Sequence, residues 1–208
     1  YYHRSLNPKR LIEAKFSHKP LNVPLSCVIK KFKLPAETSI PGLRPMLKKD
    51  VPEVRALLNE YMSKFNFVPV FKTDDEVKHW ILTRGVVWSF VVEDPETKKV
   101  TDFFSFYYLP SSVIGHQVHK TINAVYLFYY AVKESDEKST KGRLQSLMKD
   151  ALILAKLKSV DFFNCLDLLE NKLFIEELKF GPGDGYLNYY MYNWRCREMG
   201  SEKVGVVM

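Results

Sequence analysis

Three runs of residues decide the fold: VVWSFVVED (residues 86–94), VTDFFSFYYL (100–109) and INAVYLFYYAV (122–132). β-branched and aromatic residues dominate each run, which is typical of strands. The turn sequence EDPETKK separates the first two runs, so we expect a hairpin there. The third run is apolar throughout, which predicts a strand that is buried on both faces.

Helices are predicted on both sides of these strands. Apolar residues recur every three or four positions at 51–65, 73–82 and 141–158. Asp50 is placed to cap the first helix, and Thr73 with Glu76 forms a capping box at the start of the second. The remaining predictions are a buried strand VDFFNCL (160–166), a helix ENKLFIEELKF (170–180) and a last strand LNYYMYNWR (187–195).

This order predicts an α/β fold with a mixed sheet flanked by helices, because each strand-helix unit covers one face of a sheet. The order resembles the acyl-CoA N-acyltransferase (GNAT) fold. Residues 1–36 contain several prolines, so we expect an extended lead-in that packs on the fold, with one short helix at 7–14. Residues 37–208 then form the GNAT-like domain. The chain opens directly on YYHRSLNPKRL, which predicts a piece cut from a larger protein.

Composition argues against several classes of protein. The formal charge of +7 comes from scattered Lys and Arg residues without a long basic run, so we expect no nucleic-acid partner. No apolar stretch approaches the roughly 20 residues that a membrane-spanning helix needs, so we expect no transmembrane segment. Cys27, Cys165 and Cys196 are widely spaced, which favours neither a disulfide framework nor a metal site. A reducing, cytoplasmic location fits best.

The glycine-rich loop FGPGDG (180–185) raises the question of a phosphate site. It follows a helix and precedes a strand, the reverse of what phosphate-binding glycine motifs require. We therefore interpret it as a helix end and turn, in which Gly181 or Gly183 adopts a positive φ. Asp184, its charged residue, would attract an amine or a lysine side chain.

In GNAT enzymes a glycine-rich helix start holds the pyrophosphate of the acyl-CoA. The corresponding stretch here, STKGRLQSLM (139–148), contains Gly142 and Arg143 but lacks the second small residue of that motif. We therefore expect an ordinary helix start and no CoA binding at this position.

Tyrosines are concentrated on three of the predicted strands, and a core cannot bury that many phenol hydroxyls without partners. Some of them should therefore line a groove where a polar ligand meets aromatic walls. The tyrosines concerned are Tyr107, Tyr108, Tyr126, Tyr129, Tyr130, Tyr189, Tyr190 and Tyr192.

Several motifs together resemble the N-myristoyltransferase family, and specifically its C-terminal half. They are YYHRSLNPKRL with KFSH, GLRPM, VTDFFSFYYLPS, AVYLFYYA, DALILAK, DFFNCLD, LKFGPGDGYLNYYMYNW and VGVVM. The resemblance covers essentially the whole chain, and DFFSFYYLPSSVI and YLFYYA look most like the fungal members.

The resemblance implies a protein of two pseudo-symmetric GNAT-like halves. In this family the N-terminal half holds most of myristoyl-CoA, the co-substrate, and the C-terminal half supplies most of the groove for a glycine-starting peptide. No prosthetic group is implied, and the full enzyme is expected to be a monomer. By position, the residues implied to bind the substrate peptide are Tyr1, His3, Phe16, Ser111, Tyr126, Asn164, Leu166, Asp184, Gly185 and Leu187.

The implied reaction is attack of a neutral glycine amine on a thioester. An α-amino group with a pKa near 8 is largely protonated at neutral pH, so a base must first remove a proton. In this family the base is the carboxylate at the end of the chain, which the resemblance assigns to Met208. The family tail normally carries one further residue.

Two alternatives to a peptide-binding half of this acyltransferase remain open. One is a stand-alone GNAT acetyltransferase, which the incomplete glycine motif at Gly142 argues against. The other is a peptide-binding module without catalytic activity, which nothing in the sequence of this chain argues against.

Overall fold

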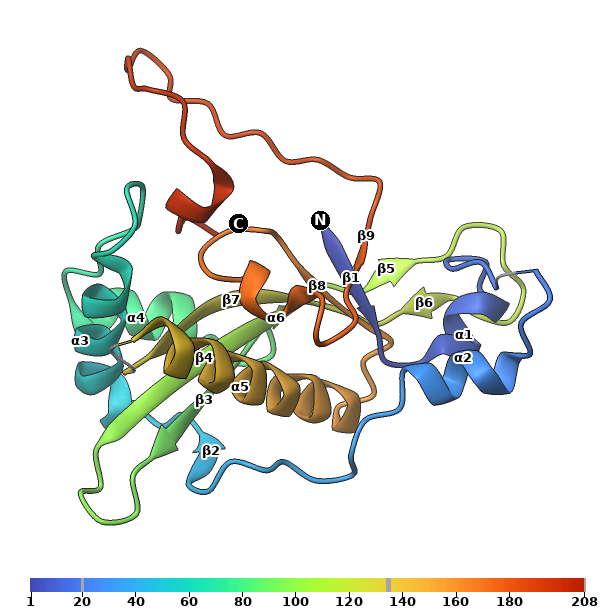
Figure 1. Ribbon diagram of the computed structural model, residues 1–208, viewed down its shortest axis with the longest axis horizontal. Helices are drawn as coiled ribbons and strands as arrows, with labels where there is room; N and C mark the ends of the chain where they lie inside the picture. Colours follow the sequence, from blue (N-terminus) through green and yellow to red (C-terminus); the bar gives the residue numbers. More distant parts are fainter. Residues whose placement is uncertain (20, 134–135, 208) are drawn as a thin grey trace.

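The computed structural model describes residues 1–19, 21–133 and 136–207 (Figure 1). Its centre is a seven-stranded sheet with the order β2-β3-β4-β7-β8-β1-β9. Among the described pairs, β7 and β8 run parallel and the other neighbours are antiparallel, so the sheet is mixed as predicted. The strands are β1 (Tyr2–Ser5), β2 (Leu43–Pro45), β3 (Val87–Glu93), β4 (Val100–Tyr108), β7 (Ala124–Val132), β8 (Phe162–Cys165) and β9 (Gly181–Pro182).

The helices surround this sheet, and α5 crosses in front of it in Figure 1. A separate pair of short strands, β5 (Ser111–Ser112) and β6 (Thr121–Ile122), lies beyond the ends of β4 and β7. The helices are α1 (Pro8–Glu13), α2 (Leu25–Lys31), α3 (Val51–Met62), α4 (Asp74–Ile81), α5 (Glu137–Leu157) and α6 (Lys172–Ile175), with 3-10 turns η1 (Lys48–Asp50) and η2 (Ser201–Lys203).

The predicted helical periodicity is confirmed in α3, α4 and α5. The capping box at the start of α4 is present, because Thr73 Oγ1 accepts from the Glu76 N–H at 3.2 Å and Glu76 accepts from the Thr73 N–H at 3.1 Å. The predicted apolar face of α5 is buried throughout against the sheet. It consists of Leu144, Leu147, Met148, Ala151, Leu152 and Ala155, each at most 1% exposed.

Strand β1 was missed by the sequence analysis. Tyr2–Ser5 does not simply extend over the surface, because it pairs with β8 on one side and β9 on the other. Arg4 of this strand is 2% exposed, and its guanidinium donates to the backbone carbonyls of Leu178, Ser5 and Phe32. The first 36 residues thus supply part of the sheet, and a domain boundary after residue 36 stays a prediction.

Three local predictions at the end of the chain were wrong. Residues 187–195 form no strand, because no described strand pairs with them. The helix predicted at 170–180 is helical only in α6, and turns follow it. The residue with positive φ after α6 is Lys179 (62°), and neither Gly181 nor Gly183 adopts that conformation.

The stretch containing Gly142 and Arg143 lies inside a helix. Asp136 caps α5 by accepting from the Ser139 N–H at 2.9 Å, so the helix begins a full turn before Gly142. Arg143 donates from Nε and Nη2 to the two carboxylate oxygens of Asp102 on β4, at 2.9 and 2.6 Å. This arginine therefore ties α5 to the sheet.

Candidate functional site

A row of polar and aromatic side chains crosses the sheet in register. Tyr107 on β4 pairs with Tyr126 on β7, Tyr126 pairs with Asn164 on β8, and Asn164 pairs with His3 on β1. Directly paired residues project to the same face of a sheet, so these four form one continuous strip, the site row. Tyr126, Asn164 and His3, which the sequence analysis singled out separately, are thus neighbours.

Aromatic contacts hold one end of the site row. The rings of Tyr107 and Tyr126 stack with centroids 5.2 Å apart and an angle of 8° between their planes. Tyr1 packs edge-on against Tyr126, with centroids 6.4 Å apart. Stacked and edge-on pairs of this kind restrict both rings, so this end is a rigid aromatic wall.

Asn164 organises the other end of the site row. It is fully buried, and its Oδ1 forms a hydrogen bond with Nδ1 of His3. Because Oδ1 can only accept, Nδ1 of His3 is the donor of this hydrogen bond, and in the neutral imidazole Nε2 is then an acceptor. Nδ2 of Asn164 has no hydrogen-bond partner in the described part of the chain. An unpartnered buried amide is unfavourable on its own, so it is available to a ligand or a water molecule.

The loop after β9 closes over His3. The Gly183 N–H donates to the Tyr1 carbonyl at 2.9 Å, and the Tyr1 nitrogen donates to the Gly185 carbonyl at 3.0 Å. A Cβ on Gly183 would lie 2.2 Å from His3 Nε2, and one on Gly185 would lie 3.3 Å from the Tyr1 ring. Gly183 is therefore required by this close approach to His3, not by a positive φ.

Beyond His3 the face continues into an aromatic cavity of about 480 Å³. Phe16 stacks on Phe162 with centroids 4.5 Å apart, and both rings meet His3 edge-on. Phe16 is brought here by the end of α1, where Lys15 adopts a φ of 59° and the Phe16 N–H donates to the Leu11 carbonyl. This cavity also reaches Ser5, Lys31, Phe32, Glu176, Lys179 and Phe180.

The remaining predicted residues are more dispersed. Tyr1, Leu166 and Leu187 line a second cavity of about 750 Å³ next to the site row. Ser111 is exposed on β5, and within the described residues no hydrogen bond joins it to the site row. Asp184 is exposed and has no ion pair or hydrogen bond with any described residue.

Residues 204–207 lie in the same region, held by hydrogen bonds. The Leu169 N–H donates to the Val204 carbonyl and the Gly205 N–H donates to the Phe67 carbonyl, so the tail is fixed at its base. Tyr189 Oη donates to the Val206 carbonyl at 2.7 Å, and the Val207 N–H donates to Tyr129 Oη at 3.2 Å. Met208, the predicted catalytic residue, lies outside the described residues.

The tyrosines around the site stay neutral. Burial raises the pKa of Tyr107 and of Tyr189 to about 12, and it also raises the pKa of Tyr126 and of Tyr129. The walls therefore present uncharged phenol groups at neutral pH. The sequence analysis named Tyr107, Tyr129 and Tyr189 only as members of a larger set of tyrosines that could line a groove. It missed Phe162, because the contacts of this ring with His3 and Phe16 arise from tertiary packing.

The chemical groups of this face are aromatic rings and hydrogen-bonding side chains. Among the described residues no three His, Cys, Asp or Glu side chains gather to hold a metal ion. None of the described helices is long and apolar enough to cross a bilayer. The face offers an aromatic wall, an imidazole and a buried amide side by side.

Comparison with known proteins places the chain in a family. The family model described as myristoyl-CoA:protein N-myristoyltransferase, C-terminal domain, matches residues 13–207. The chain belongs to this family. The predicted GNAT-like mixed sheet flanked by helices is likewise confirmed, because the chain superimposes on the corresponding part of a solved N-myristoyltransferase.

Three relatives show how far the N-myristoyltransferase similarity extends. Glycylpeptide N-tetradecanoyltransferase 2 of Bos taurus is 49% identical over 100% of this chain and 40% of its own length. The Schizosaccharomyces pombe glycylpeptide N-tetradecanoyltransferase is 47% identical over 94% of this chain and 45% of its own length. A crystal structure of Saccharomyces cerevisiae N-myristoyltransferase with bound myristoyl-CoA has a TM-score of 0.92 and 37% identity, and covers 100% of this chain and 53% of that one.

Two points follow from these relatives. The chain spans less than half the length of the curated relatives, so it corresponds to one part of an N-myristoyltransferase. The identities to the bovine and the fission-yeast protein are nearly equal, so they do not set fungal members apart.

Proposed function

We propose that this chain is the peptide-binding half of an acyltransferase that moves myristate from myristoyl-CoA to the N-terminal glycine of proteins. The observation that carries the proposal is the site row: Tyr126, Asn164 and His3 lie side by side on one face in a member of the N-myristoyltransferase family. The full enzyme is proposed to act as a cytoplasmic monomer, with most of the myristoyl-CoA site in the part of the protein that this chain does not span.

The site row supplies what a short extended peptide needs. A substrate hydroxyl or amide donating to His3 Nε2 would meet an acceptor whose tautomer is already fixed by Asn164. Tyr1, Tyr107 and Tyr126 provide a rigid apolar wall for the first residues of the peptide. Because these groups are preorganised, little conformational entropy is lost on binding.

The chemistry requires a base beside the glycine amine. Tyr189 and Tyr129 hold Val206 and Val207, the last described residues before the end of the chain, which supports a role for the terminus near this face. We propose that the terminal carboxylate accepts a proton from the glycine ammonium, after which the neutral amine attacks the thioester carbonyl. The tetrahedral intermediate then expels the CoA thiolate, which takes up the second proton that the nitrogen loses, so that the amide and the CoA thiol are formed. An apolar setting raises the pKa of a carboxylate and makes it a better base.

The test is a transfer assay with a glycine-starting peptide and myristoyl-CoA. The 208-residue chain, the remainder of the protein and the two together are compared with the full-length protein. We expect transfer by the full-length protein and by the mixture, and none by this chain alone. Absence of transfer by the full-length protein would refute the proposal, whereas acetyl transfer by this chain alone would support the stand-alone acetyltransferase.

Asp184 is expected to attract basic residues of the peptide. Its carboxylate is exposed and unpaired within the described residues, so water and salt weaken its electrostatic attraction for the peptide. Replacing Asp184 with asparagine should weaken binding of a peptide with basic residues roughly threefold, with little effect on myristoyl-CoA binding. Titration calorimetry at low and high salt measures both, and the exposed Glu96 in the β3–β4 turn provides a Glu96→Gln control. An unchanged peptide Kd at low salt would show that Asp184 has no such role.

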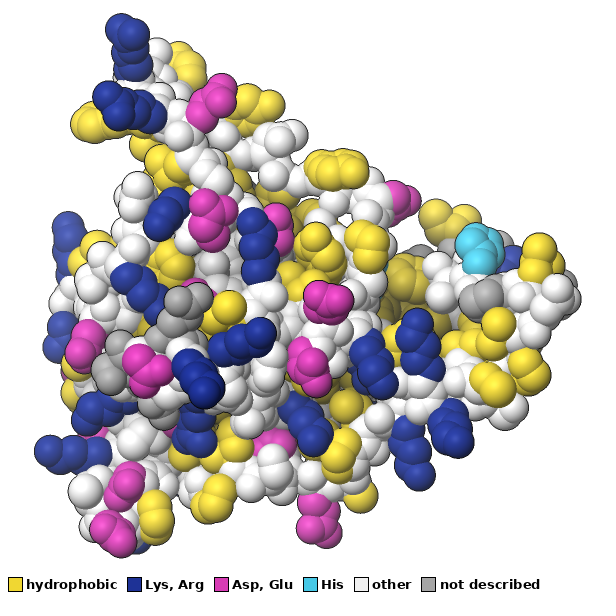
Figure 2. All heavy atoms as spheres, in the orientation of Figure 1, with side chains coloured by type: hydrophobic (Ala, Val, Ile, Leu, Met, Phe, Trp, Pro, Cys, Tyr) yellow, Lys and Arg dark blue, Asp and Glu magenta, His cyan; other side chains and the backbone are white. Residues whose placement is uncertain are grey.

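The segment from Tyr186 to Met199 is expected to dock on the rest of the protein. It leaves the body after β9 and returns at η2 (Figure 1), and its side chains project at the top of Figure 2. Tyr186, Tyr190, Tyr192 and Trp194 are 89%, 87%, 92% and 69% exposed. That much exposed aromatic surface, with no described strand paired to it, is typical of a segment that docks on another protein surface.

This docking is measurable by hydrogen exchange. When the remainder of the protein is added to the 208-residue chain, backbone amides of 186–199 should become protected by about tenfold or more. The exposed β3–β4 turn around Glu96 serves as the internal control and should not change. Equal exchange of 186–199 in the separate chain and in the complex would contradict the docking without bearing on transfer activity.

A further inference from the structure

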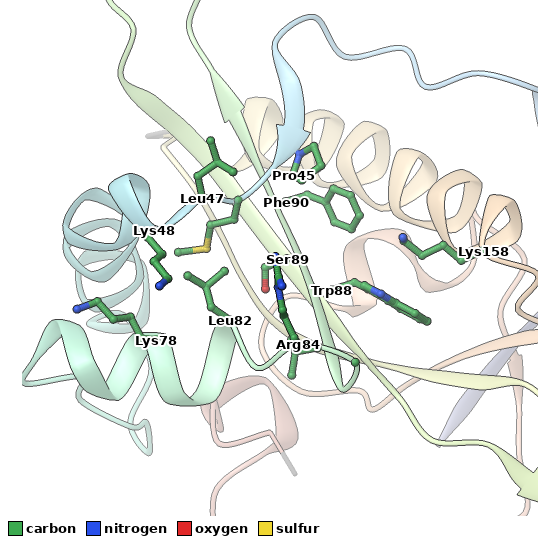
Figure 3. A pocket seen from close by; sticks show the side chains of 13 residues that line it. Pro45, Leu47, Lys48, Lys78, Leu82, Arg84, Trp88, Ser89, Phe90 and Lys158 are labelled. Carbon is green, nitrogen blue, oxygen red and sulfur yellow. The ribbon is translucent and has the colours of Figure 1, made fainter.

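A groove of about 850 Å³ lies on the side of the molecule where β2 meets β3 (Figure 3). Its floor is apolar: Met46 and Phe90 are buried, and Leu47, Leu82 and Trp88 complete it. Trp88 and Phe90 pair with Phe106 and Phe104 in the β3–β4 ladder, so they project to the face opposite Tyr107 and the site row. The groove is therefore separate from the proposed peptide site.

The rim of this groove is positively charged. Lys48, Lys78, Arg84 and Lys158 line it, and none of the Asp and Glu residues that the structure describes does. Lys78 pairs with the exposed Asp75 at 2.9 Å, but the other three cations have no carboxylate partner among the described residues. The Lys158 ammonium lies over the Trp88 ring, 5.0 Å from its centroid.

The cations surround the floor and are not gathered at one point. In Figure 3, Lys48 and Lys78 stand at one end and Lys158 at the other, with the apolar floor between them. A ligand with a single charged head would be recognised by cations at one end. This distribution instead complements an elongated ligand that carries negative charge at several positions.

We propose that this groove binds an extended acidic segment of a partner protein, with apolar side chains on Trp88 and Leu47 and carboxylates on the lysine and arginine rim. The apolar floor supplies affinity, and the rim supplies charge selection and faster association. This binding is independent of the transfer reaction, because the groove lies on the other face of the sheet from the site row.

The test uses the full-length protein and a fluorescent peptide of alternating Glu and Leu, with a Lys and Leu peptide as its counterpart. Fluorescence anisotropy should show binding of the acidic peptide only, and added salt should weaken it. In the Lys48→Glu/Lys158→Glu double variant the Kd should rise by about tenfold or more, with transfer activity unchanged. A Lys138→Glu/Lys141→Glu variant, which changes the net charge equally at the opposite end of α5, should bind as the unaltered protein does.

Several results would overturn the proposal. These are absence of acidic-peptide binding, equal binding of the basic peptide, and an unchanged Kd in the groove variant. Binding by the 208-residue chain but not by the full-length protein would show that the rest of the polypeptide occupies the groove. If vesicles containing anionic phospholipid bind through Lys48 and Lys158 while the peptide does not, the groove recognises a lipid surface instead.

Discussion

Replacing Gly183 with alanine is expected to lower the affinity for a glycine-starting peptide by about tenfold or more while the fold is retained. The new Cβ would lie 2.2 Å from His3 Nε2, far inside van der Waals contact. His3 cannot simply move aside, because Asn164 holds its Nδ1 and Phe162 packs against its ring. Either the imidazole rotates and loses Asn164, or the loop shifts and loses the hydrogen bond from Gly183 to Tyr1.

Either response removes a hydrogen bond that positions His3 or Tyr1 in the site. A second glycine of the same loop, Gly181, provides the control. A Cβ on Gly181 would meet nothing within 4 Å, so Gly181→Ala should leave peptide binding unchanged although it lies two residues away. Calorimetric titration with peptide, together with a thermal melt, separates a binding defect from unfolding. If Gly183→Ala binds peptide as tightly as Gly181→Ala, His3 does not form part of the peptide site.

The Gly183 case also shows what sequence reasoning reached and what it did not. The sequence analysis assigned a positive φ to Gly181 or Gly183. In the structure Lys179 has the positive φ, and Gly183 is needed because the loop after β9 lies against His3 of β1. That contact joins segments about 180 residues apart in the chain, for which local sequence has no signal. The resemblance to a family pointed to His3 and Asn164 individually, and only the strand register shows that they are in contact.

Elements that depend on local periodicity were predicted well. Each of these elements buries a face that can be recognised from the spacing of its own apolar residues. They are α3, α4, α5, β3, β4, β7 and β8. Strand β1 was missed because Tyr2–Ser5 becomes a strand only through β8 and β9. The strand predicted at 187–195 failed for the converse reason. Its aromatic pattern suits a strand, but the described part of the chain holds no partner for it.

The second large effect is expected from Arg143→Met, which should lower the stability of the protein by about 3 kcal/mol or more. Asp102 is 2% exposed, and both of its carboxylate oxygens accept hydrogen bonds from Arg143. Without the guanidinium, Thr101 Oγ1 still donates to Asp102 at 2.7 Å, but the buried charge has lost its counterion. An uncompensated charge in the interior is far more costly than a lost surface pair.

An exposed arginine–aspartate pair, joined by a single contact, provides the control for this variant. Arg55 Nε lies 2.6 Å from Asp74, but both side chains are more than a third exposed, so Arg55→Met should cost less than about 1 kcal/mol. Urea denaturation at pH 7 measures both variants, and the double variant Asp102→Asn/Arg143→Met should recover part of the loss. The transfer rate per folded molecule should not change, because this arginine is occupied in joining α5 to β4. Equal destabilisation by Arg55→Met and Arg143→Met would contradict the structural role assigned to Asp102. If fully folded Arg143→Met protein loses its transfer rate, Arg143 takes part in the reaction instead.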